Sequence, residues 1–326
     1  MRNDALAFWL REPGQGEIRP VQLRVPGPAD VLVRTQYSGV SRGTETIVFR
    51  GGVPVSDAAA MRAPFQEGEF PGPVKYGYLN VGVVEHGPRE LLGRRVFCLF
   101  PHQTAYVVPV DSVFPVPDGI PSPRAVLAGT VETAVNALWD AGPLVGDRIA
   151  VVGAGMVGCC VARLLTRIPG TRVTLVDVDA TRWEVAGALD VQFAHPADAA
   201  GGNDIVVHTS ATSEGLRRCV DLLAPEGTVI ELSWYGDAEV QLSLGGRFHY
   251  GRLGIRASQV GTVAAARRGS RSTADRLTLA LELLHDPAFD ALITGESSFD
   301  DLPEVMAKLA TGSLPALCHT INYGAG

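Results

Sequence analysis

The sequence lacks several features that mark particular classes of protein. Its five cysteines (Cys98, Cys159, Cys160, Cys219 and Cys318) contain no CxxC pair, which argues against a four-cysteine zinc lobe and favours reduced thiols. No apolar run approaches the length of a membrane span. The opening segment MRNDALAFWLREPG is broken by charges and proline, so a signal peptide is not expected. These absences predict a cytoplasmic protein that does not enter a membrane.

Positive charge is also scarce. The 326 residues carry a net charge of −7, and the basic cluster at residues 267–276 is explained more simply as a solvated loop and helix start than as an anion site. Nucleic acid is therefore not an expected partner. The hydrophobic share of 46% and the charged share of 19% are those of an ordinary globular protein, and the length predicts two domains.

The pattern of short elements changes about a third of the way along the chain. Residues 1–121 contain β-branched segments bounded by glycine and proline, which predict an antiparallel barrel-type domain. Residues 122–262 begin with a helix over 122–142 and then alternate strands with helices, which predicts βαβ units and a parallel sheet. After Gly261 the pattern predicts two amphipathic helices and a final strand within residues 263–326.

The stretch IAVVGAGMVGCCVARLL has the order strand, glycine turn, helix. In a βαβ unit Gly153 permits the tight turn, Gly155 leaves room for a diphosphate, and Gly158 allows close packing of helix on strand. The free N–H groups of the first helical turn, where Met156 and Val157 lie, then face the phosphates. The stretch therefore predicts a dinucleotide-binding site.

Asp177 follows the next predicted strand, nineteen residues beyond Gly158. An acidic side chain at this place accepts hydrogen bonds from the adenosine ribose and repels a 2′-phosphate, so NAD is favoured over NADP. Arg182 weakens this preference because it can lie over the adenine or reach a phosphate. Ligands bind outside the carboxyl ends of parallel strands, so Ser210 and Ser233, which follow later strands, are expected to line the cofactor site.

The β-rich first part, the nucleotide-binding middle and the short helical return resemble the medium-chain dehydrogenase/reductase superfamily over nearly the whole chain. The resemblance implies an α/β fold class. It combines a GroES-like β-barrel catalytic domain, from residues 1–121 and 263–326, with a Rossmann domain whose doubly wound parallel sheet comes from residues 122–262. It also implies a small-molecule substrate bound between the two domains, a homodimer, and a contact of Thr133 with the nicotinamide.

Zinc-dependent members of that superfamily carry a cysteine, a histidine and a further cysteine or acidic residue as metal ligands. At the matching places this sequence has Ser41 in YSGVSRGTET, Tyr78 in VKYGYLNVGVVE and Gly129 in LAGTVETA. Serine, tyrosine and glycine do not make a tetrahedral zinc site, so no zinc is expected. The segment SGVSRGTE resembles the corresponding loop of bacteriochlorophyllide hydroxyethyl dehydrogenases, which favours an alcohol or ketone as the reacting group.

Without zinc, a side-chain donor must stabilise the substrate oxygen during hydride transfer. Tyr78 and Lys75 are candidates because an ammonium beside a phenol lowers the phenol pKa. Thr44 is a candidate for a proton relay, with helix capping as the alternative role for it and for Ser41. His102 is a further acid–base candidate, although a single histidine is more often structural.

Three other hypotheses remain open. A metal held by Glu45, His102 and Glu132 would make the protein a zinc-dependent alcohol dehydrogenase with atypical ligands, although Glu132 is also suited to pairing with an arginine. A quinone or enoyl reductase would prefer NADPH, against which Asp177 argues. A protein that binds NAD and catalyses nothing would act as a sensor or structural subunit.

Overall fold

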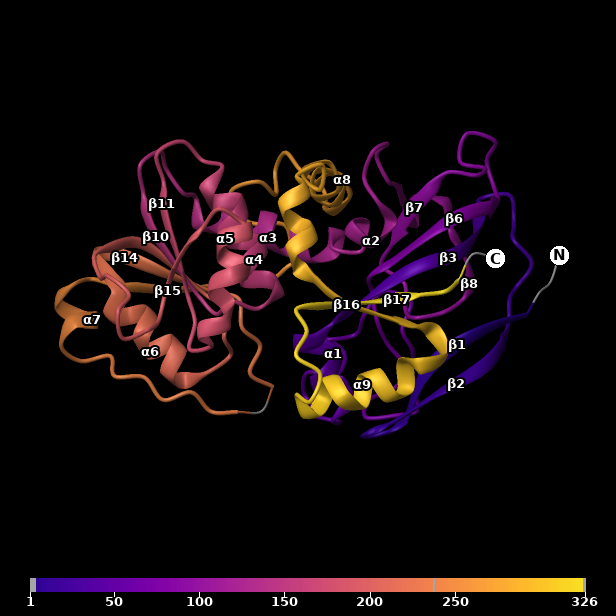
Figure 1. Cartoon of the computed structure of the whole chain (residues 1–326), viewed down its shortest axis with the longest axis horizontal. Coiled ribbons are helices and arrows are strands. Elements are labelled where there is room, and N and C mark those ends of the chain that lie inside the picture. Colours follow the sequence, from indigo (N-terminus) through magenta and orange to yellow (C-terminus); the bar gives the residue numbers. More distant parts are fainter. Residues whose placement is uncertain (1–3, 237, 325–326) are drawn as a thin grey trace. The chain divides into compact units, whose positions relative to one another are not determined.

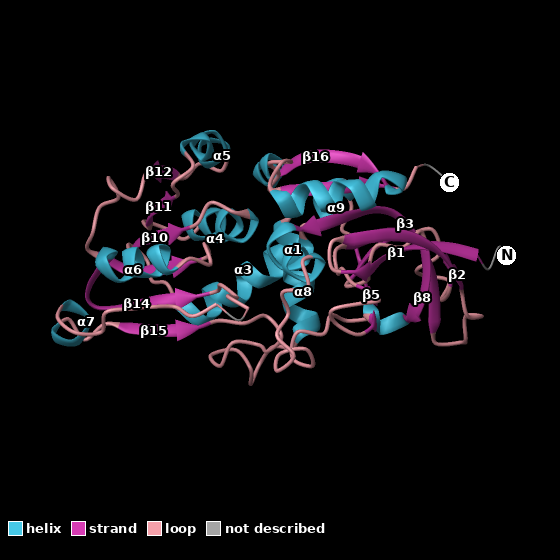
Figure 2. Ribbon diagram, turned by 90° about the horizontal axis from the view of Figure 1, so that it is seen from below, coloured by secondary structure: helices cyan, strands magenta, loops and turns pink. Residues whose placement is uncertain are grey.

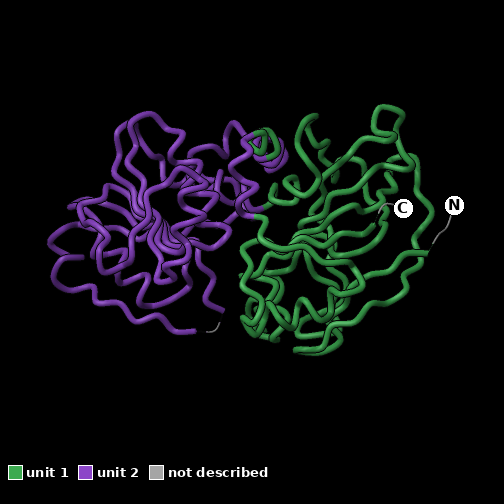
Figure 3. The backbone as a smooth tube through the Cα atoms, in the orientation of Figure 1, with its two compact units in different colours: residues 1–129, 281–285, 293–326 green, residues 130–280, 286–292 purple. Residues whose placement is uncertain are grey.

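The computed structural model describes residues 4–236 and 238–324, and it divides into two compact units (Figure 3). Unit 1 comprises residues 1–129, 281–285 and 293–326, and unit 2 comprises residues 130–280 and 286–292. Each unit has its own sheet structure and its own core, so each is described separately.

Unit 2 is built on a parallel sheet. Its strands lie in the order β12 (Gln192–Ala194), β11 (Arg172–Val176), β10 (Arg148–Val152), β13 (Asn203–His208), β14 (Leu223–Glu231) and β15 (Gly254–Ala257). This is the 3-2-1-4-5-6 order of a doubly wound dinucleotide-binding domain, whose switch point lies between β10 and β13. The central strands are runs of valine, isoleucine and leucine, which is typical of parallel strands buried on both faces.

Helices of unit 2 pack on this sheet (Figures 1 and 2). The helix α4 (Met156–Thr166) contacts β10 and β11, α6 (Ser213–Leu222) contacts β13 and β14, and α5 (Trp183–Ala188) contacts β12 at the edge. A short helix, α7 (Arg247–Tyr250), precedes β15, and 3-10 turns cover Ala180–Arg182 and Pro287–Leu292. Two helices belong partly to each unit along the chain: α3 (Ala128–Ala141) and α8 (Thr273–Leu283).

Unit 1 contains mostly antiparallel sheets. The larger runs β16 (Ile293–Ser298), β17 (Cys318–Asn322), β3 (Asp30–Ser41), β6 (Asn80–His86), β7 (Arg95–Cys98) and β9 (Val113–Pro115), with β8 (Ala105–Pro109) paired to β3. The smaller runs β2 (Gln15–Gln22), β1 (Asp4–Glu12), β5 (Val74–Lys75) and β4 (Glu67–Gly68). Alternate residues of β3, Val31 and Val33, pack with Val84 and Tyr106 in a buried core, as the two-residue period of a strand requires.

Three helices complete unit 1: α1 (Arg42–Phe49), α2 (Ser122–Ala125) and α9 (Leu302–Thr311). Helix α1 starts directly where β3 ends and packs against α9. Helix α9 has Pro303 in its first turn and stops at Gly312, whose φ of 77° is the left-handed conformation that terminates a helix. A 3-10 turn at Val110–Ser112 and another at Phe299–Asp301 connect neighbouring elements.

The structure corrects two expectations about local elements. The predicted helix over 122–142 is interrupted at Val126 and Leu127, which are fully buried, so packing there overrides a continuous helical preference. Strand β16 was not expected, because ITGESS has too few apolar residues to predict a strand; it pairs in parallel with β17 at the edge of the larger sheet. Among the described residues, no helix is both long and apolar enough to cross a bilayer.

The compact units also differ in extent from the predicted domains. Residues 122–129 group with unit 1, and residues 263–280 group with unit 2. A physical reason is visible in the second case. Arg276 of α8 is buried in an ion pair with Glu132 of α3, 3.0 Å between Nη2 and Oε1, which attaches that helix to unit 2.

Candidate functional site

The glycine turn that follows β10 has the geometry that was predicted from its three glycines. Gly153 has a φ of 111°, and a Cβ there would lie 2.7 Å from Thr209 Oγ1. A Cβ on Gly158 would lie 1.9 Å from the carbonyl oxygen of Gly153, so only glycine lets α4 approach this closely. A Cβ on Gly155 would meet no heavy atom within 4 Å. The turn is tight at its two ends and open in its middle.

Hydrogen-bond donors surround the open middle of the turn. The first helical bond of α4 is donated by Cys159 to Gly155, so the N–H groups of Met156, Val157 and Gly158 precede it and have no helical acceptor. Amides in this arrangement, with the positive end of the helix dipole, suit a diphosphate. The residues present therefore fit the phosphates of a dinucleotide.

Asp177, the first residue after β11, lies beside the same turn. Its Oδ2 accepts the N–H of Ala154 at 2.6 Å, and its Oδ1 accepts the N–H of Asp179 at 2.8 Å. These bonds fix a half-buried carboxylate that still has acceptor capacity for a ribose hydroxyl. Arg182 pairs with Asp179 at 3.2 Å, and Thr133 lies half-buried on α3.

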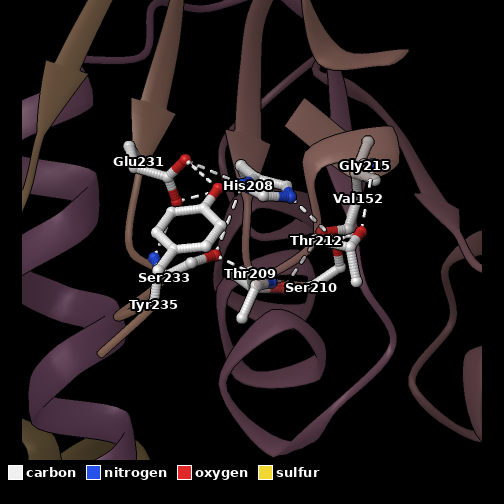
Figure 4. Close-up of polar contacts among 10 residues, drawn as sticks. Val152, His208, Thr209, Ser210, Thr212, Gly215, Glu231, Ser233 and Tyr235 are labelled. Carbon is white, nitrogen blue, oxygen red and sulfur yellow. Dashed lines mark hydrogen bonds and ion pairs between the residues drawn. The ribbon is translucent and has the colours of Figure 1, made fainter. Parts of the chain in front are cut away.

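A polar cluster lies where β13 and β14 end, next to the switch point (Figure 4). His208 and Glu231 are partners in the ladder, and Nδ1 of His208 lies 2.8 Å from Oε2 of Glu231. Nε2 of His208 lies 2.7 Å from Oγ of Ser210. The N–H of Ser233 donates to Glu231 at 2.7 Å, and the hydroxyl of Tyr235 donates to Glu231 at 3.0 Å. The structure thus joins Ser210 and Ser233, which the sequence predicted separately.

Sequence reasoning missed the central role of Glu231. The available signals were a carboxylate at the end of an apolar strand, GTVIE, and a histidine at the end of the preceding one, DIVVH. Burial alone would raise the pKa of Glu231, but hydrogen bonds from His208 and Ser233 hold it below its usual value. The carboxylate is therefore charged at neutral pH.

In unit 1, Tyr78 lies beside the start of α1. Its phenol is hydrogen-bonded to the side chains of Ser41 and Thr44, and its ring meets that of Tyr76 edge-on at 5.9 Å. Burial and the negative charge of Glu45 raise the pKa of Tyr78 to about 12, against the lowering effect of the two hydroxyl groups. Ser41 occupies the cap position of α1 without a side-chain cap bond; the carboxylate of Glu45 accepts the Ser41 N–H instead, at 2.8 Å.

The predicted pairing of Lys75 with Tyr78 is wrong. The ammonium of Lys75, only 1% exposed, donates to Glu67 at 2.5 Å and to Gln103 at 2.7 Å. Burial lowers the pKa of Lys75, and Glu67 opposes that shift. The pKa of the Tyr78 phenol is shifted in the opposite direction to the one expected, because burial raises it and because its charged neighbour is Glu45 rather than an ammonium.

His102 occupies the centre of a buried row of polar side chains. Its Nε2 lies 2.9 Å from Oε2 of Glu45, and its Nδ1 lies 2.6 Å from Oγ of Ser38, which in turn lies 2.9 Å from the hydroxyl of Tyr323. The residues His102, Glu45 and Ser38 are at most 2% exposed. His102 therefore holds the start of α1 in place and has no exposed surface of the kind that contacts a substrate.

The places that the resemblance assigns to zinc ligands do not fit a metal. The side chains of Ser41 and Tyr78 are hydrogen-bonded to each other, and Gly129 has no side chain. A Cβ at Gly129 would lie 2.7 Å from Leu79 Cδ2, so Leu79 fills the space that a ligand there would need. Over residues 4–236 and 238–324, no group of three or more His, Cys, Asp or Glu side chains is arranged to hold a metal ion. Glu132, which belongs to the alternative set of metal ligands, is paired with Arg276, so the predicted pairing of Glu132 with an arginine is confirmed. The five cysteines are buried, and none of them forms a disulfide.

No family model matches the chain. Among curated proteins it is similar to the D-guloside 3-dehydrogenase of Shigella flexneri, with 21% identity over 310 residues that cover 86% of each chain. It is also similar to the L-threonine 3-dehydrogenase of Deinococcus radiodurans, with 24% identity over 220 residues. That match covers 57% of this chain and only 60% of the threonine dehydrogenase.

Solved structures show a closer likeness in fold. A structure described as a short chain alcohol dehydrogenase from Escherichia coli CFT073, complexed with NADH, matches with a TM-score of 0.78 and 14% identity, over 98% of this chain and 100% of that one. A protein described as a zinc-binding dehydrogenase, from Sinorhizobium meliloti 1021 and bound to NADP, matches with a TM-score of 0.80 and 17% identity, over 99% and 100%.

The chain has the fold of these dehydrogenase structures. The α/β class predicted from the sequence, with a Rossmann sheet in one unit and antiparallel sheets in the other, is confirmed. Within this fold, the glycine turn and the strand-end cluster belong to unit 2, and the row around Tyr78 and His102 belongs to unit 1.

Proposed function

We propose that this chain is a dehydrogenase that transfers a hydride between NAD(H) and a substrate carrying a hydroxyl or carbonyl group. The observation that carries the proposal is the glycine turn between β10 and α4, at the switch point of a 3-2-1-4-5-6 sheet and open at Gly155. Two facts support the same class. The curated relatives are a guloside and a threonine dehydrogenase, and two similar structures contain NADH and NADP.

In this proposal the cofactor lies along the carboxyl edge of the parallel sheet. The amides of Gly155, Met156, Val157 and Gly158 bind the diphosphate, with Gly153 shaping the turn. Asp177 accepts a hydrogen bond from the adenosine ribose hydroxyl, and its negative charge selects NAD over NADP because it repels a 2′-phosphate. Arg182, Thr133, Ser210 and Ser233 are proposed as further contacts along the same edge.

The nicotinamide supplies the hydride donor or acceptor, and the protein supplies the proton. We assign the proton to Oη of Tyr78, because its raised pKa keeps the phenol protonated at neutral pH and able to donate to a carbonyl oxygen. The hydroxyl groups of Ser41 and Thr44, both hydrogen-bonded to that phenol, pass a proton to it from solvent. His102 and Glu45 act as positioning residues, because the imidazole lies against the Glu45 carboxylate of α1. Lys75 acts as a positioning residue on the strand before Tyr78, where its ammonium holds Glu67 and Gln103.

Zinc is not part of this mechanism. The donor set does not suit zinc, because Ser41, Tyr78 and Gly129 supply neither thiolate nor imidazole, and His102 has both ring nitrogens engaged. The proposal is tested by titrating NADH and NADPH and by assaying a panel of secondary alcohols and ketones after chelation. Turnover that survives full removal of metal is expected. Turnover that tracks stoichiometric zinc would instead support a zinc enzyme, and tight NADH binding without any turnover would support a sensor.

Replacing Asp177 with asparagine is expected to weaken NADH binding about tenfold and to narrow the preference for NADH over NADPH. The reason is that the ribose hydroxyl loses a charged acceptor, worth about 1.5–3 kcal/mol, and a 2′-phosphate is no longer repelled. Dissociation constants from the quenching of protein fluorescence measure both effects. The matched control is Asp204→Asn, which removes the same charge from a carboxylate that is paired with Arg148, near the starts of β13 and β10. Equal affinities of Asp177→Asn and the unchanged protein would contradict the assignment.

The expectations about the substrate, the oligomeric state and the cellular location remain predictions. The similarity of SGVSRGTE to the loop of bacteriochlorophyllide dehydrogenases favours a hydroxyl or ketone substrate, and the resemblance favours a homodimer. The cytoplasmic location follows from the sequence alone. Light scattering on the purified chain measures the oligomeric state.

A further inference from the structure

In the strand-end cluster of unit 2, the side chains of His208, Glu231 and Ser210 are each held by more than one hydrogen bond (Figure 4). His208 is fully buried and is the last residue of β13, and Glu231 is the last residue of β14. The ring of His208 is covered by the ring of Tyr235, with centroids 6.2 Å apart and planes 30° apart. The imidazole is therefore held in one orientation by the sheet, by a carboxylate and by an aromatic ring.

That orientation fixes which ring nitrogen carries the proton. Nδ1 lies 3.0 Å and 2.8 Å from the two carboxylate oxygens of Glu231, which only accept, so Nδ1 carries the hydrogen. In the neutral imidazole Nε2 is then an acceptor, and the hydroxyl 2.7 Å away on Ser210 must donate to it. The carboxylate thus sets the direction of the Ser210 hydroxyl through the imidazole.

A second hydroxyl completes the arrangement around Ser210. Oγ1 of Thr212 accepts the N–H of Gly215 at 3.0 Å, at the start of α6, and lies 3.1 Å from Oγ of Ser210. Because the hydroxyl hydrogen of Ser210 is donated to His208, Oγ of Ser210 offers only its two lone pairs to other groups. One lone pair points to Thr212, and the other points outward from this half-buried residue. The group that meets Ser210 from outside must be a donor, such as a ribose hydroxyl.

The same cluster is tied to the glycine turn. The hydroxyl of Thr209, between His208 and Ser210, donates to the carbonyl oxygen of Gly153 at 2.8 Å. Ser233 accepts the N–H of Ala211 at 3.0 Å, which joins the segment after β13 to the one after β14. Ser210 is therefore held at a fixed place beside the turn proposed to bind the diphosphate.

We propose that Glu231, His208 and Ser210 form a polarised relay that makes the Ser210 hydroxyl a fixed hydrogen-bond acceptor for a ribose hydroxyl of the bound dinucleotide. His208 and Glu231 are positioning residues, and Ser210 makes the contact. This inference rests on the proposed binding of a dinucleotide.

The test is the dissociation constant of NADH, measured by fluorescence titration at pH 8, with the thermal unfolding midpoint of each variant measured beside it. Ser210→Ala is expected to bind NADH about tenfold more weakly, and His208→Gln several-fold more weakly. A deoxyribose analogue of NADH that lacks the contacting hydroxyl is expected to bind the unchanged protein and Ser210→Ala equally well, which a merely structural role of the serine does not predict. Ser210→Ala removes one oxygen from a half-buried side chain, so it also serves if His208→Gln does not fold. The matched control is His249→Gln, an exposed histidine on α7, which is expected to keep the full affinity.

The outcomes separate the two proposals. If the unchanged protein binds neither NADH nor NADPH, the proposed function fails. If it binds NADH but Ser210→Ala and His208→Gln keep its affinity, the relay is wrong while the function stands. An affinity lost in His249→Gln as much as in His208→Gln would also overturn the relay.

Discussion

Replacing Tyr78 with phenylalanine is expected to lower kcat for carbonyl reduction by about 10²-fold to 10⁴-fold, with little change in KM for NADH. The substitution removes a single hydroxyl, which the proposal makes the donor to the developing alkoxide. The ring keeps its edge-on contact with Tyr76, so the fold is expected to be retained. Steady-state kinetics with a ketone substrate, together with the thermal unfolding midpoint, measure both parts of this expectation.

Tyr76→Phe is the matched control for this experiment. Tyr76 lies two residues before Tyr78 and contacts its ring, but the Tyr76 hydroxyl makes only a 3.5 Å hydrogen bond to the carbonyl of Met61, and burial raises the pKa of Tyr76 strongly. Its loss is expected to change kcat less than tenfold. Equal kcat values for Tyr78→Phe and Tyr76→Phe would remove Tyr78 from the proposed mechanism, while leaving cofactor binding untouched.

The direction of the pKa shift predicts how the two reaction directions respond to pH. With a pKa raised to about 12, Tyr78 stays protonated from pH 6 to pH 10, so its donation to a carbonyl oxygen is unaffected over that range. Alcohol oxidation requires the deprotonated phenol, and its rate is expected to rise with pH throughout the same range. Initial rates in both directions, measured with saturating cofactor, check the asymmetry. Rates of oxidation that do not depend on pH would point to a different base.

The parts of the site that the sequence predicts are those determined by local geometry. Gly153, Gly155 and Gly158 are spaced for one turn, and Asp177 follows the next strand of the same βαβ unit, so the pattern within about thirty residues was sufficient. The α/β fold class followed from the same local alternation. The helix interruption at Val126 depends on burial in the folded unit, which no local pattern reports.

The parts that the sequence did not predict depend on register between distant strands. His208 and Glu231 meet because β13 and β14 pair in one particular register, and a shift by one residue would turn the two side chains to opposite faces. Lys75 was assigned to Tyr78 from its position in the sequence, but β5 pairs with β4, and that pairing brings Glu67 to the ammonium. Burial is the largest cause of both pKa shifts, and the charges that modify them come from residues that are close in space.

Replacing Arg276 with methionine is expected to destabilise the protein by about 3–5 kcal/mol, because it leaves Glu132 as an uncompensated buried charge. Arg276 is 1% exposed, and its guanidinium donates to Glu132 at 3.0 Å and to Asn136 at 2.5 Å. Even with the arginine present, burial raises the pKa of Glu132, against the attraction of Arg276. Urea unfolding at pH 7 measures the loss. The comparison is Arg148→Met, which breaks a solvent-exposed pair with Asp204 and is expected to change stability far less.

The pH dependence of the Arg276→Met variant identifies the cause of its loss. Without the guanidinium, the pKa of Glu132 in the folded protein rises further above its unfolded value. A carboxyl group shifted in this direction contributes stability below its unfolded pKa and loses that contribution as pH rises through the folded pKa. The deficit relative to the unchanged protein is therefore expected to be smaller at pH 5 than at pH 8. Adding Glu132→Leu to the variant is expected to recover part of the stability at pH 8, since the unpaired charge is then gone. A deficit that is equal at both pH values, and unrelieved in the double variant, would show that lost packing of α8, rather than a buried charge, is responsible.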